Sequence, residues 1–135
     1  MGGGKGMKPN ETPSTQIVCL VDDDRAVLKS IGRLLNSAGF EVRSFSEPEN
    51  FLAYVTEHSV AVVILDIWME QMNGLEVQAR LSKVSPGTRV IIITGCKDAT
   101  TEKTAAQFGA SGFFTKPFDD EEFLRGVRAA LSDVK

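Results

Sequence analysis

Hydrophobic residues fall into two patterns that alternate along the chain. Short continuous apolar runs, of which residues 60–65 form the longest, are typical of strands buried in a parallel sheet. Between these runs, apolar residues recur with the period of an amphipathic helix. The expected strands are 16–21, 41–45, 60–66, 89–94 and 112–115. The expected helices are 25–38, 47–56, 74–82, 100–108 and 119–134.

Local signals mark several ends of these elements. Gly39 and Gly109 follow two expected helices, and Gly39 is expected to take the left-handed conformation that ends a helix. Ser46 is expected to cap helix 47–56, with Pro48 tolerated in its first turn. Strand 41–45 alternates and is short, which favours an edge position in the sheet.

The five alternations of strand and helix predict a doubly wound α/β domain with a parallel sheet and helices on both faces. In such folds, ligands bind beyond the carboxyl ends of the strands. Residues that directly follow each strand are therefore the first candidates for a site.

Length and composition fit one globular domain, at 135 residues and 42% hydrophobic residues. Residues 1–15 lack periodicity and are interpreted as a flexible leader. Part of this leader, up to Met7, is interpreted as a cloning remnant. Residues 16–135 are interpreted as the domain. No membrane span or secretory signal is recognisable, so a cytoplasmic location with Cys19 and Cys96 reduced is expected.

Charge and histidine content exclude several classes of function. The net charge is -3 and no basic block occurs, which argues against direct nucleic-acid binding. His58 is the only histidine, so a zinc site of the usual kind and a Ser-His-Asp triad are not expected.

Polar residues stand at four of the five expected strand ends. These are Asp22, Asp23, Asp24, Asp66, Thr94 and Lys116. Taken singly, each fits a cap, a turn or a loop, and the aromatic residues Phe113 and Trp68 fit half-buried packing. Taken together, carboxylates from two strands would repel one another, and a divalent cation such as Mg²⁺ would remove that cost. A cation, an ammonium group and a hydroxyl around one carboxylate suit a phosphoryl group, with that carboxylate as nucleophile.

Four motifs carry a resemblance to a known family. They are V-D-D-D at 21–24, L-D-I-W-M at 65–69, I-T-G at 93–95 and F-F-T-K-P-F at 113–118. Together they resemble the receiver domain of two-component response regulators, and the last two resemble the FixJ/NarL-like branch of transcriptional regulators. The resemblance covers residue 16 onward and implies a CheY-like, flavodoxin-like sheet of five strands in the order 2-1-3-4-5, with five helices.

The resemblance assigns a phosphoacceptor and a Mg²⁺ site. Asp66 would be the phosphoacceptor, Asp23 a direct metal ligand and Asp22 a ligand acting mainly through a metal-bound water. The backbone carbonyl of Trp68 would complete the protein ligands. Glu70 stands where the family very often has proline, so the loop after Asp66 is expected to be looser.

The resemblance also assigns a switch. Lys116 would pair with a phosphoryl oxygen, and Thr94 would bond another once phosphate is present. Phe113 would be the aromatic residue that swings inward when Thr94 moves, and the Lys116–Pro117 peptide would be cis.

The implied function is a phosphorylation-dependent signalling switch rather than an enzyme of metabolism. Its partners would be a sensor histidine kinase, a second copy in a phosphorylation-dependent homodimer, and a DNA-binding output domain missing from this sequence; a lone receiver is the alternative. The kinase is expected to dock at the first helix (Arg25, Val27, Leu28) and at the loop of Pro117 and Phe118.

Three other functions remain open. A flavodoxin-like cofactor binder shares the architecture, but Asp22 to Asp24 would repel its phosphate. A haloacid dehalogenase-type phosphatase needs an acid two residues after its nucleophile, where Trp68 stands. A phosphorylation-independent interaction module, or pseudo-receiver, would share the fold without the chemistry.

Overall fold

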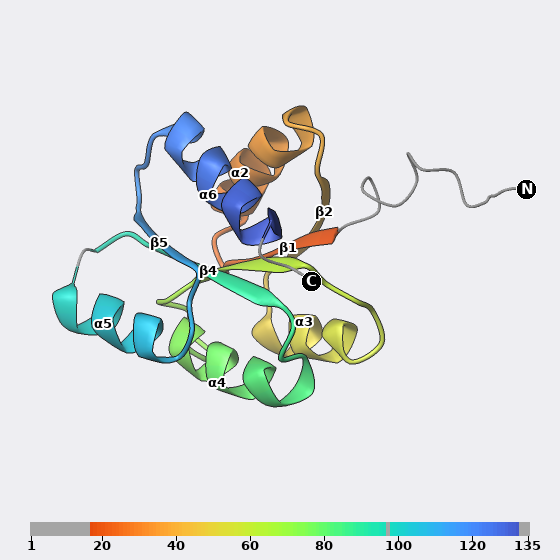
Figure 1. Ribbon diagram of the computed structural model, residues 1–135, viewed down its shortest axis with the longest axis vertical. Coiled ribbons are helices and arrows are strands. Elements are labelled where there is room, and N and C mark those ends of the chain that lie inside the picture. The colour runs from red at the N-terminus through yellow and green to blue at the C-terminus, as the bar shows by residue number, and fades with distance from the viewer. Residues whose placement is uncertain (1–16, 97, 133–135) are drawn as a thin grey trace, which may run out of the picture.

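Five parallel strands form the centre of the computed structural model, which describes residues 17–96 and 98–132 (Figure 1). The strands are β1 (Ile17–Val21), β2 (Glu41–Phe45), β3 (Val62–Asp66), β4 (Arg89–Thr94) and β5 (Gly112–Thr115). The helices are α2 (Arg25–Ser37), α3 (Pro48–Val55), α4 (Gly74–Val84), α5 (Ala99–Gln107) and α6 (Asp120–Ser132). The sheet order β2-β1-β3-β4-β5 confirms the doubly wound fold with order 2-1-3-4-5.

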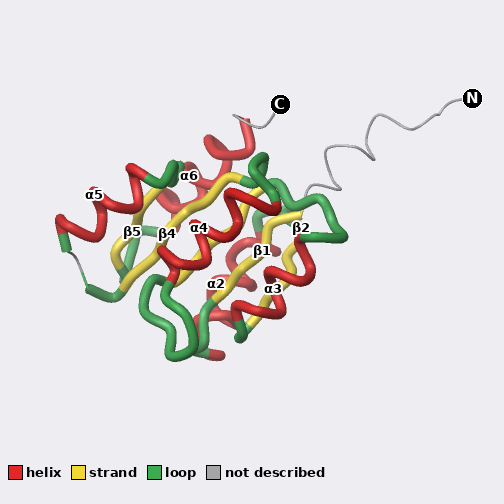
Figure 2. The backbone as a smooth tube through the Cα atoms, turned by 90° about the horizontal axis from the view of Figure 1, so that it is seen from below, coloured by secondary structure: helices red, strands yellow, loops and turns green. Residues whose placement is uncertain are grey.

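Helices cover both faces of the sheet, with α2 and α6 on one face and α3, α4 and α5 on the other (Figures 1 and 2). Each strand contributes side chains to the cores on both faces of the sheet, because successive side chains of a strand point to opposite faces. Val62 and Ile64 of β3 pack in the core under α2 and α6, whereas Val63 and Leu65 pack in the core under α3 to α5. All five residues of β3 are buried, which explains its uninterrupted apolar sequence.

Helix ends follow the signals in the sequence at several positions. Gly39 (φ 95°) and Gly109 (φ 94°) both adopt the left-handed conformation that favours glycine. At the amino-terminal ends, the side chain of Asp24 accepts hydrogen bonds from the backbone N–H groups of Ala26 and Val27. Asp98 caps α5 in the same way through the N–H of Thr100.

Some predicted details are wrong. Ser46 does not cap α3, because Pro48 occupies the first helical position and leaves Glu47 at the cap, where its side chain makes no capping hydrogen bond. β3 begins at Val62 rather than at residue 60, and α4 continues to Val84 rather than ending at residue 82. α5 lies one residue earlier than expected, and α6 begins at Asp120 while Asp119 caps it.

The expected leader, residues 1–15, lies outside the described residues, as do Gln16 and Val134 at the ends of two expected elements. Among the described helices, none combines the length and apolar character needed to cross a membrane.

Candidate functional site

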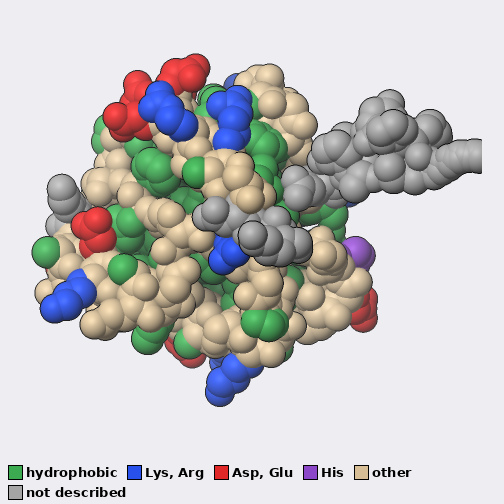
Figure 3. All heavy atoms as spheres, viewed as in Figure 1, with side chains coloured by type: hydrophobic (Ala, Val, Ile, Leu, Met, Phe, Trp, Pro, Cys, Tyr) green, Lys and Arg blue, Asp and Glu red, His purple; other side chains and the backbone are tan. Residues whose placement is uncertain are grey.

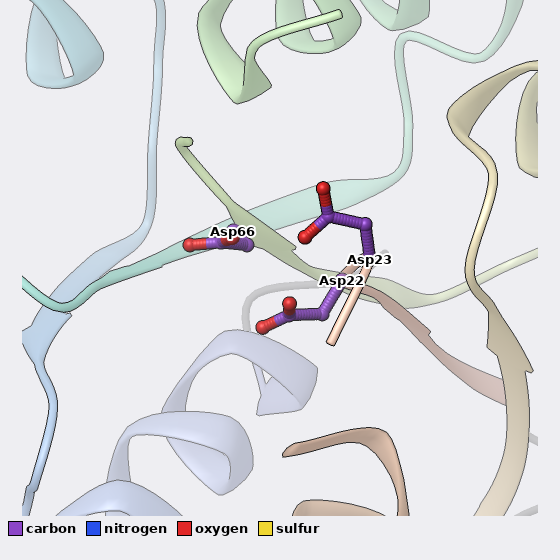
Figure 4. Close-up of side chains that lie close together, drawn as sticks. All are labelled: Asp22, Asp23 and Asp66. Atoms are coloured by element: carbon purple, nitrogen blue, oxygen red, sulfur yellow. The ribbon is translucent and has the colours of Figure 1, made fainter. Parts of the chain in front are cut away.

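Three carboxylates meet at the carboxyl edge of the sheet (Figure 4). Asp22 and Asp23 directly follow β1, and Asp66 is the last residue of β3, the neighbour of β1 in the sheet. One oxygen atom from each carboxylate lies within 4.8 Å of the others. Asp22 is fully buried and Asp66 is 5% exposed, whereas Asp23 is exposed. The structure therefore brings together the three acidic residues that the sequence predicts as one site.

Backbone N–H groups orient all three carboxylates. Asp22 Oδ1 accepts from the N–H of Asp24 at 2.9 Å, and Asp23 Oδ2 accepts from the N–H of Glu70 at 3.0 Å. The N–H of Trp68 donates to the carboxyl group of Asp66. The loop after β3 thus reaches back to the loop after β1, which holds Asp23 beside Asp66.

Lys116 is the cation beside the cluster. Its Nζ lies 3.3 Å from Asp22 Oδ2 and 3.7 Å from Asp66 Oδ1. Its backbone N–H donates to the carbonyl of Thr94 at 2.7 Å, which ties the loop after β5 to the end of β4. The peptide bond to Pro117 is cis, as the sequence resemblance implies.

The electrostatics of the site are unbalanced, with three carboxylates and one ammonium group. Burial, followed in size by the neighbouring negative charge of Asp22, raises the pKa of Asp66 from 3.8 to about 6, and the positive charge of Lys116 partly opposes this rise. The oxygen-only donor set and the excess negative charge fit a hard divalent cation such as Mg²⁺.

Thr94 and Phe113, the two residues expected to form the switch, lie on β4 and β5, the next two strands of the sheet after β3. Thr94 ends β4 and is fully buried; its hydroxyl donates to the carbonyl of Cys96 and accepts from the N–H of Cys96, both at 3.2 Å. Phe113 is half-buried and lines a small hollow, about 120 Å³, with Ala105 and Ala106 of α5. The threonine hydroxyl is therefore engaged with its own turn in this structure.

Trp68 differs from the ordinary expectation of half-buried packing. Its side chain is 56% exposed, because the loop after Asp66 turns it outward while the neighbouring Ile67 and Met69 are buried. The role of the Trp68 carbonyl as a metal ligand stays a prediction.

Gly74 is a site residue that the sequence reasoning missed. Its N–H donates to the carbonyl of Ile67 at 2.8 Å, and a Cβ placed on it would lie 2.6 Å from the backbone oxygen of Asp66. Only glycine allows α4 to begin this close to the phosphoacceptor candidate. The signal was present as Asn73-Gly74, in which Asn73 caps α4.

A groove of about 390 Å³ lies beside the site, between α2 and the loop after β5. Its lining includes Val27, Ile31 and Leu34 of α2 together with Lys116, Pro117 and Phe118. Of the expected docking residues, the groove therefore joins Val27 with Pro117 and Phe118, while Arg25 and Leu28 are not part of its lining.

Comparison with known proteins identifies the family. Residues 18–128 match the sequence profile of the response regulator receiver domain. The response regulator protein TodT of Pseudomonas putida is 39% identical over 115 residues, which are 85% of this chain and 51% of TodT. The transcriptional regulatory protein TdiR of Thauera aromatica is 32% identical over 126 residues, 93% of this chain and 56% of TdiR.

Structural comparison agrees. The crystal structure of FixJ-N superimposes with a TM-score of 0.83 at 30% identity, over 89% of this chain and 96% of that chain. This chain spans about half the length of TodT and TdiR, so the likeness concerns one part of those proteins. From its sequence, its sheet order and its acidic edge, the chain belongs to the response regulator receiver domain family.

Proposed function

We propose that this receiver domain accepts a phosphoryl group on Asp66 from a phosphohistidine of a sensor histidine kinase. The observation that carries the proposal is the environment of Asp66, which is buried beside two further carboxylates and 3.7 Å from the ammonium group of Lys116. A phosphoryl group entering there meets an oxygen nucleophile and a positive charge at the same time.

In the proposed reaction, a carboxylate oxygen of Asp66 attacks phosphorus as the phosphorus–nitrogen bond of the phosphohistidine breaks. The bonding electron pair stays on the imidazole nitrogen of the donor, and an aspartyl phosphate forms. Lys116 pairs with one phosphoryl oxygen and the hydroxyl of Thr94 bonds another. Most of what phosphoryl transfer requires from a protein is such positioning and charge neutralisation.

Asp22, Asp23 and Asp66, with the carbonyl of Trp68, would hold Mg²⁺. The bound ion supplies neutralisation of the negative charge on the phosphoryl oxygens. The fit of the donor set supports this assignment, because oxygen atoms of the three carboxylates lie within 4.8 Å of one another. Among the described residues, the only cation paired with them is Lys116, which contacts Asp22 and Asp66. The protein's activity would be limited to its own phosphorylation and slow dephosphorylation.

The switch is proposed to run from Thr94 to Phe113. Phosphorylation adds about 1.5 to 2 negative charges. Drawing the Thr94 hydroxyl toward the phosphoryl group would break its two contacts with Cys96. Phe113 would then move at the hollow that it shares with α5. The changed surface of α5, β5 and α6 would bind a second copy of the chain.

The proposed setting is a cytoplasmic two-component system that regulates transcription. TdiR is a transcriptional regulatory protein of which this chain spans 56%, which supports a DNA-binding output domain outside this sequence. The receiver itself is not proposed to contact DNA, because its net charge is -3. On the face shown in Figure 3, Lys and Arg side chains are scattered while acidic side chains gather at the end near α6.

Incubation with acetyl phosphate and Mg²⁺, followed by intact-protein mass spectrometry, tests the proposal. We expect a gain of about 80 Da, one added phosphoryl group, in the wild type. Asp66→Asn and an EDTA-treated wild type are expected to show none. A wild type that gains no mass under conditions in which a known receiver does would instead support the pseudo-receiver alternative.

A further inference from the structure

Lys116 lies on a short connection between β5 and α6, and an aromatic contact holds the end of this connection that is nearer to α6. Phe118, two residues after Lys116, stacks on Phe123 of α6 with ring centroids 4.5 Å apart and an interplanar angle of 18°. Phe123 is fully buried in the core under α2 and α6. The Phe118 ring thus fixes the end of the connection to an element that cannot move without disturbing the core.

Phe114 completes an aromatic cluster with Phe118 and Phe123. Its ring contacts both edge-on, with centroids 6.0 Å and 5.6 Å away. A Cβ placed on Gly126 of α6 would lie 2.7 Å from Cζ of Phe114, so the cluster is closely packed against α6. Close packing of this kind keeps the Phe118 ring from shifting toward Phe114 and α6.

The backbone on either side of the Lys116 side chain is therefore held at two points. Before the side chain, the N–H of Lys116 donates to the carbonyl of Thr94 at 2.7 Å. After it, Pro117 is exposed and has no N–H to donate, so the next described side chain that anchors the connection is Phe118. Between these two anchors, the Lys116 ammonium group reaches Asp22 and Asp66.

Phe118 is not simply a core residue. It is half-buried, and it lines the groove between α2 and the loop after β5 together with Lys116 itself.

We propose that Phe118 is a positioning residue for Lys116: its stack on Phe123 holds the connection so that the Lys116 ammonium group stays between Asp22 and Asp66. The role in phosphoryl transfer rests on the proposed function of Asp66, whereas the positioning of Lys116 does not. The two statements can therefore be tested separately.

The first test uses NMR of the metal-free protein and needs no phosphorylation. The ε-methylene signal of Lys116, assigned by its loss in Lys116→Arg, is expected to differ from that of exposed Lys103. In Phe118→Ala and Phe118→Leu it moves toward the Lys103 signal, and in Phe118→Tyr, which keeps the ring, it stays near the wild-type position. Phe40→Ala is the matched control, because Phe40 packs on the same core but precedes β2, at the opposite edge of the sheet.

The second test measures the rate of phosphorylation by acetyl phosphate at a temperature at which every variant is folded. Phe118→Ala is expected to lower the rate about tenfold, because small displacements of a positioned group are costly, and Phe118→Tyr to restore it. In the Lys116→Met background, the same Phe118→Ala change is expected to alter the rate less than about twofold, since Phe118 is proposed to affect the rate only through the position of Lys116.

The outcomes separate the two claims. An unchanged Lys116 signal in Phe118→Ala, an effect as large in Phe40→Ala, or equal rate losses with and without Lys116 would each overturn the positioning role. A wild type that gains no phosphate, together with a shifted Lys116 signal, would contradict the proposed function of Asp66 and leave Phe118 as the positioning residue of Lys116.

Discussion

The ammonium group of Lys116 lies closer to Asp22 than to Asp66, at 3.3 Å against 3.7 Å. Asp22 is the most deeply buried carboxylate of the cluster, and Lys116 is the one cation that the described structure places against it. Without metal, Lys116 thus compensates the buried charge of Asp22, which is one of the proposed metal ligands. The lysine has a structural role before any phosphoryl group arrives.

Replacing this lysine is expected to destabilise the metal-free protein. Lys116→Met leaves Asp22 buried without its cation, and breaking a buried pair typically costs about 3 kcal/mol. Urea unfolding in EDTA measures the loss, and Lys103→Met, at an exposed position of α5, serves as the control. Equal unfolding free energies for the two variants would show that the contact with Asp22 contributes nothing.

Magnesium is expected to stabilise the domain by relieving repulsion among the three carboxylates. At a Mg²⁺ concentration ten times the dissociation constant, the gain in unfolding free energy is about 1.4 kcal/mol. Asp23→Asn should lose most of this gain in unfolding free energy. The substitution is otherwise mild, because position 23 is exposed and the asparagine amide oxygen can still accept the hydrogen bond from the N–H of Glu70. The comparison requires NaCl controls of matched ionic strength. A gain of the same size in Asp23→Asn would place the cation elsewhere.

The raised pKa of Asp66 predicts how stability depends on pH. The folded protein holds the Asp66 proton up to a pKa of about 6, whereas an ordinary aspartate releases it near 3.8. The contribution of Asp66 to stability without metal therefore falls as pH rises from about 4 to about 6 and levels off above that range. The rise of the Asp66 pKa from 3.8 to about 6 corresponds to a loss of roughly 3 kcal/mol in the unfolding free energy across this pH range.

Asp66→Asn removes this dependence, because the amide has no proton to lose. Relative to the wild type in EDTA, the variant should gain stability as pH rises from 4 to 8, by up to about 3 kcal/mol. Urea unfolding across this pH range measures the gain, with Glu57→Gln as an exposed control. A difference between Asp66→Asn and wild type that stays constant with pH would contradict the burial of an ionisable group there.

The close approach of α4 to the backbone of Asp66 makes Gly74 sensitive to substitution. In Gly74→Ala, the new methyl group would meet the Asp66 carbonyl oxygen at 2.6 Å and the Cα of Ile67 at 3.0 Å, neither of which can rotate away. The expected loss of unfolding free energy is about 2 kcal/mol. Gly87→Ala is the matched control, since nothing lies within 4 Å of the added carbon. Equal unfolding free energies for the two variants would contradict this prediction and show that the loop after β3 can shift to accommodate the methyl group.

Much of the fold could be predicted because hydrophobic pattern and glycine placement determine it locally. Strands 41–45, 89–94 and 112–115 have the predicted bounds, and Gly39 and Gly109 end their helices as expected. The start of β3 was missed because Val60 is as apolar and buried as the strand itself, so no pattern marks the boundary. Ser46 was misassigned because a serine beside Pro48 looks like a cap until the position of the first helical residue is known.

The members of the site could be predicted, but not their geometry. Parallel strands bring their carboxyl ends to one edge, which is enough to unite Asp22, Asp23 and Asp66. Nothing in the pattern indicates that Lys116 lies nearer Asp22 than Asp66, or that Trp68 points outward. Those features depend on loop conformations fixed by individual backbone contacts, such as the N–H of Glu70 on Asp23.

The central claim is that Asp66, rather than either neighbouring carboxylate, receives the phosphoryl group. Borohydride reduces an aspartyl phosphate to homoserine, which marks the acceptor permanently. After treatment with acetyl phosphate and Mg²⁺, peptide mass spectrometry should find homoserine in place of Asp66 and unmodified Asp22 and Asp23. Homoserine at position 22 or 23, or at position 66 equally in samples with EDTA, would contradict the account.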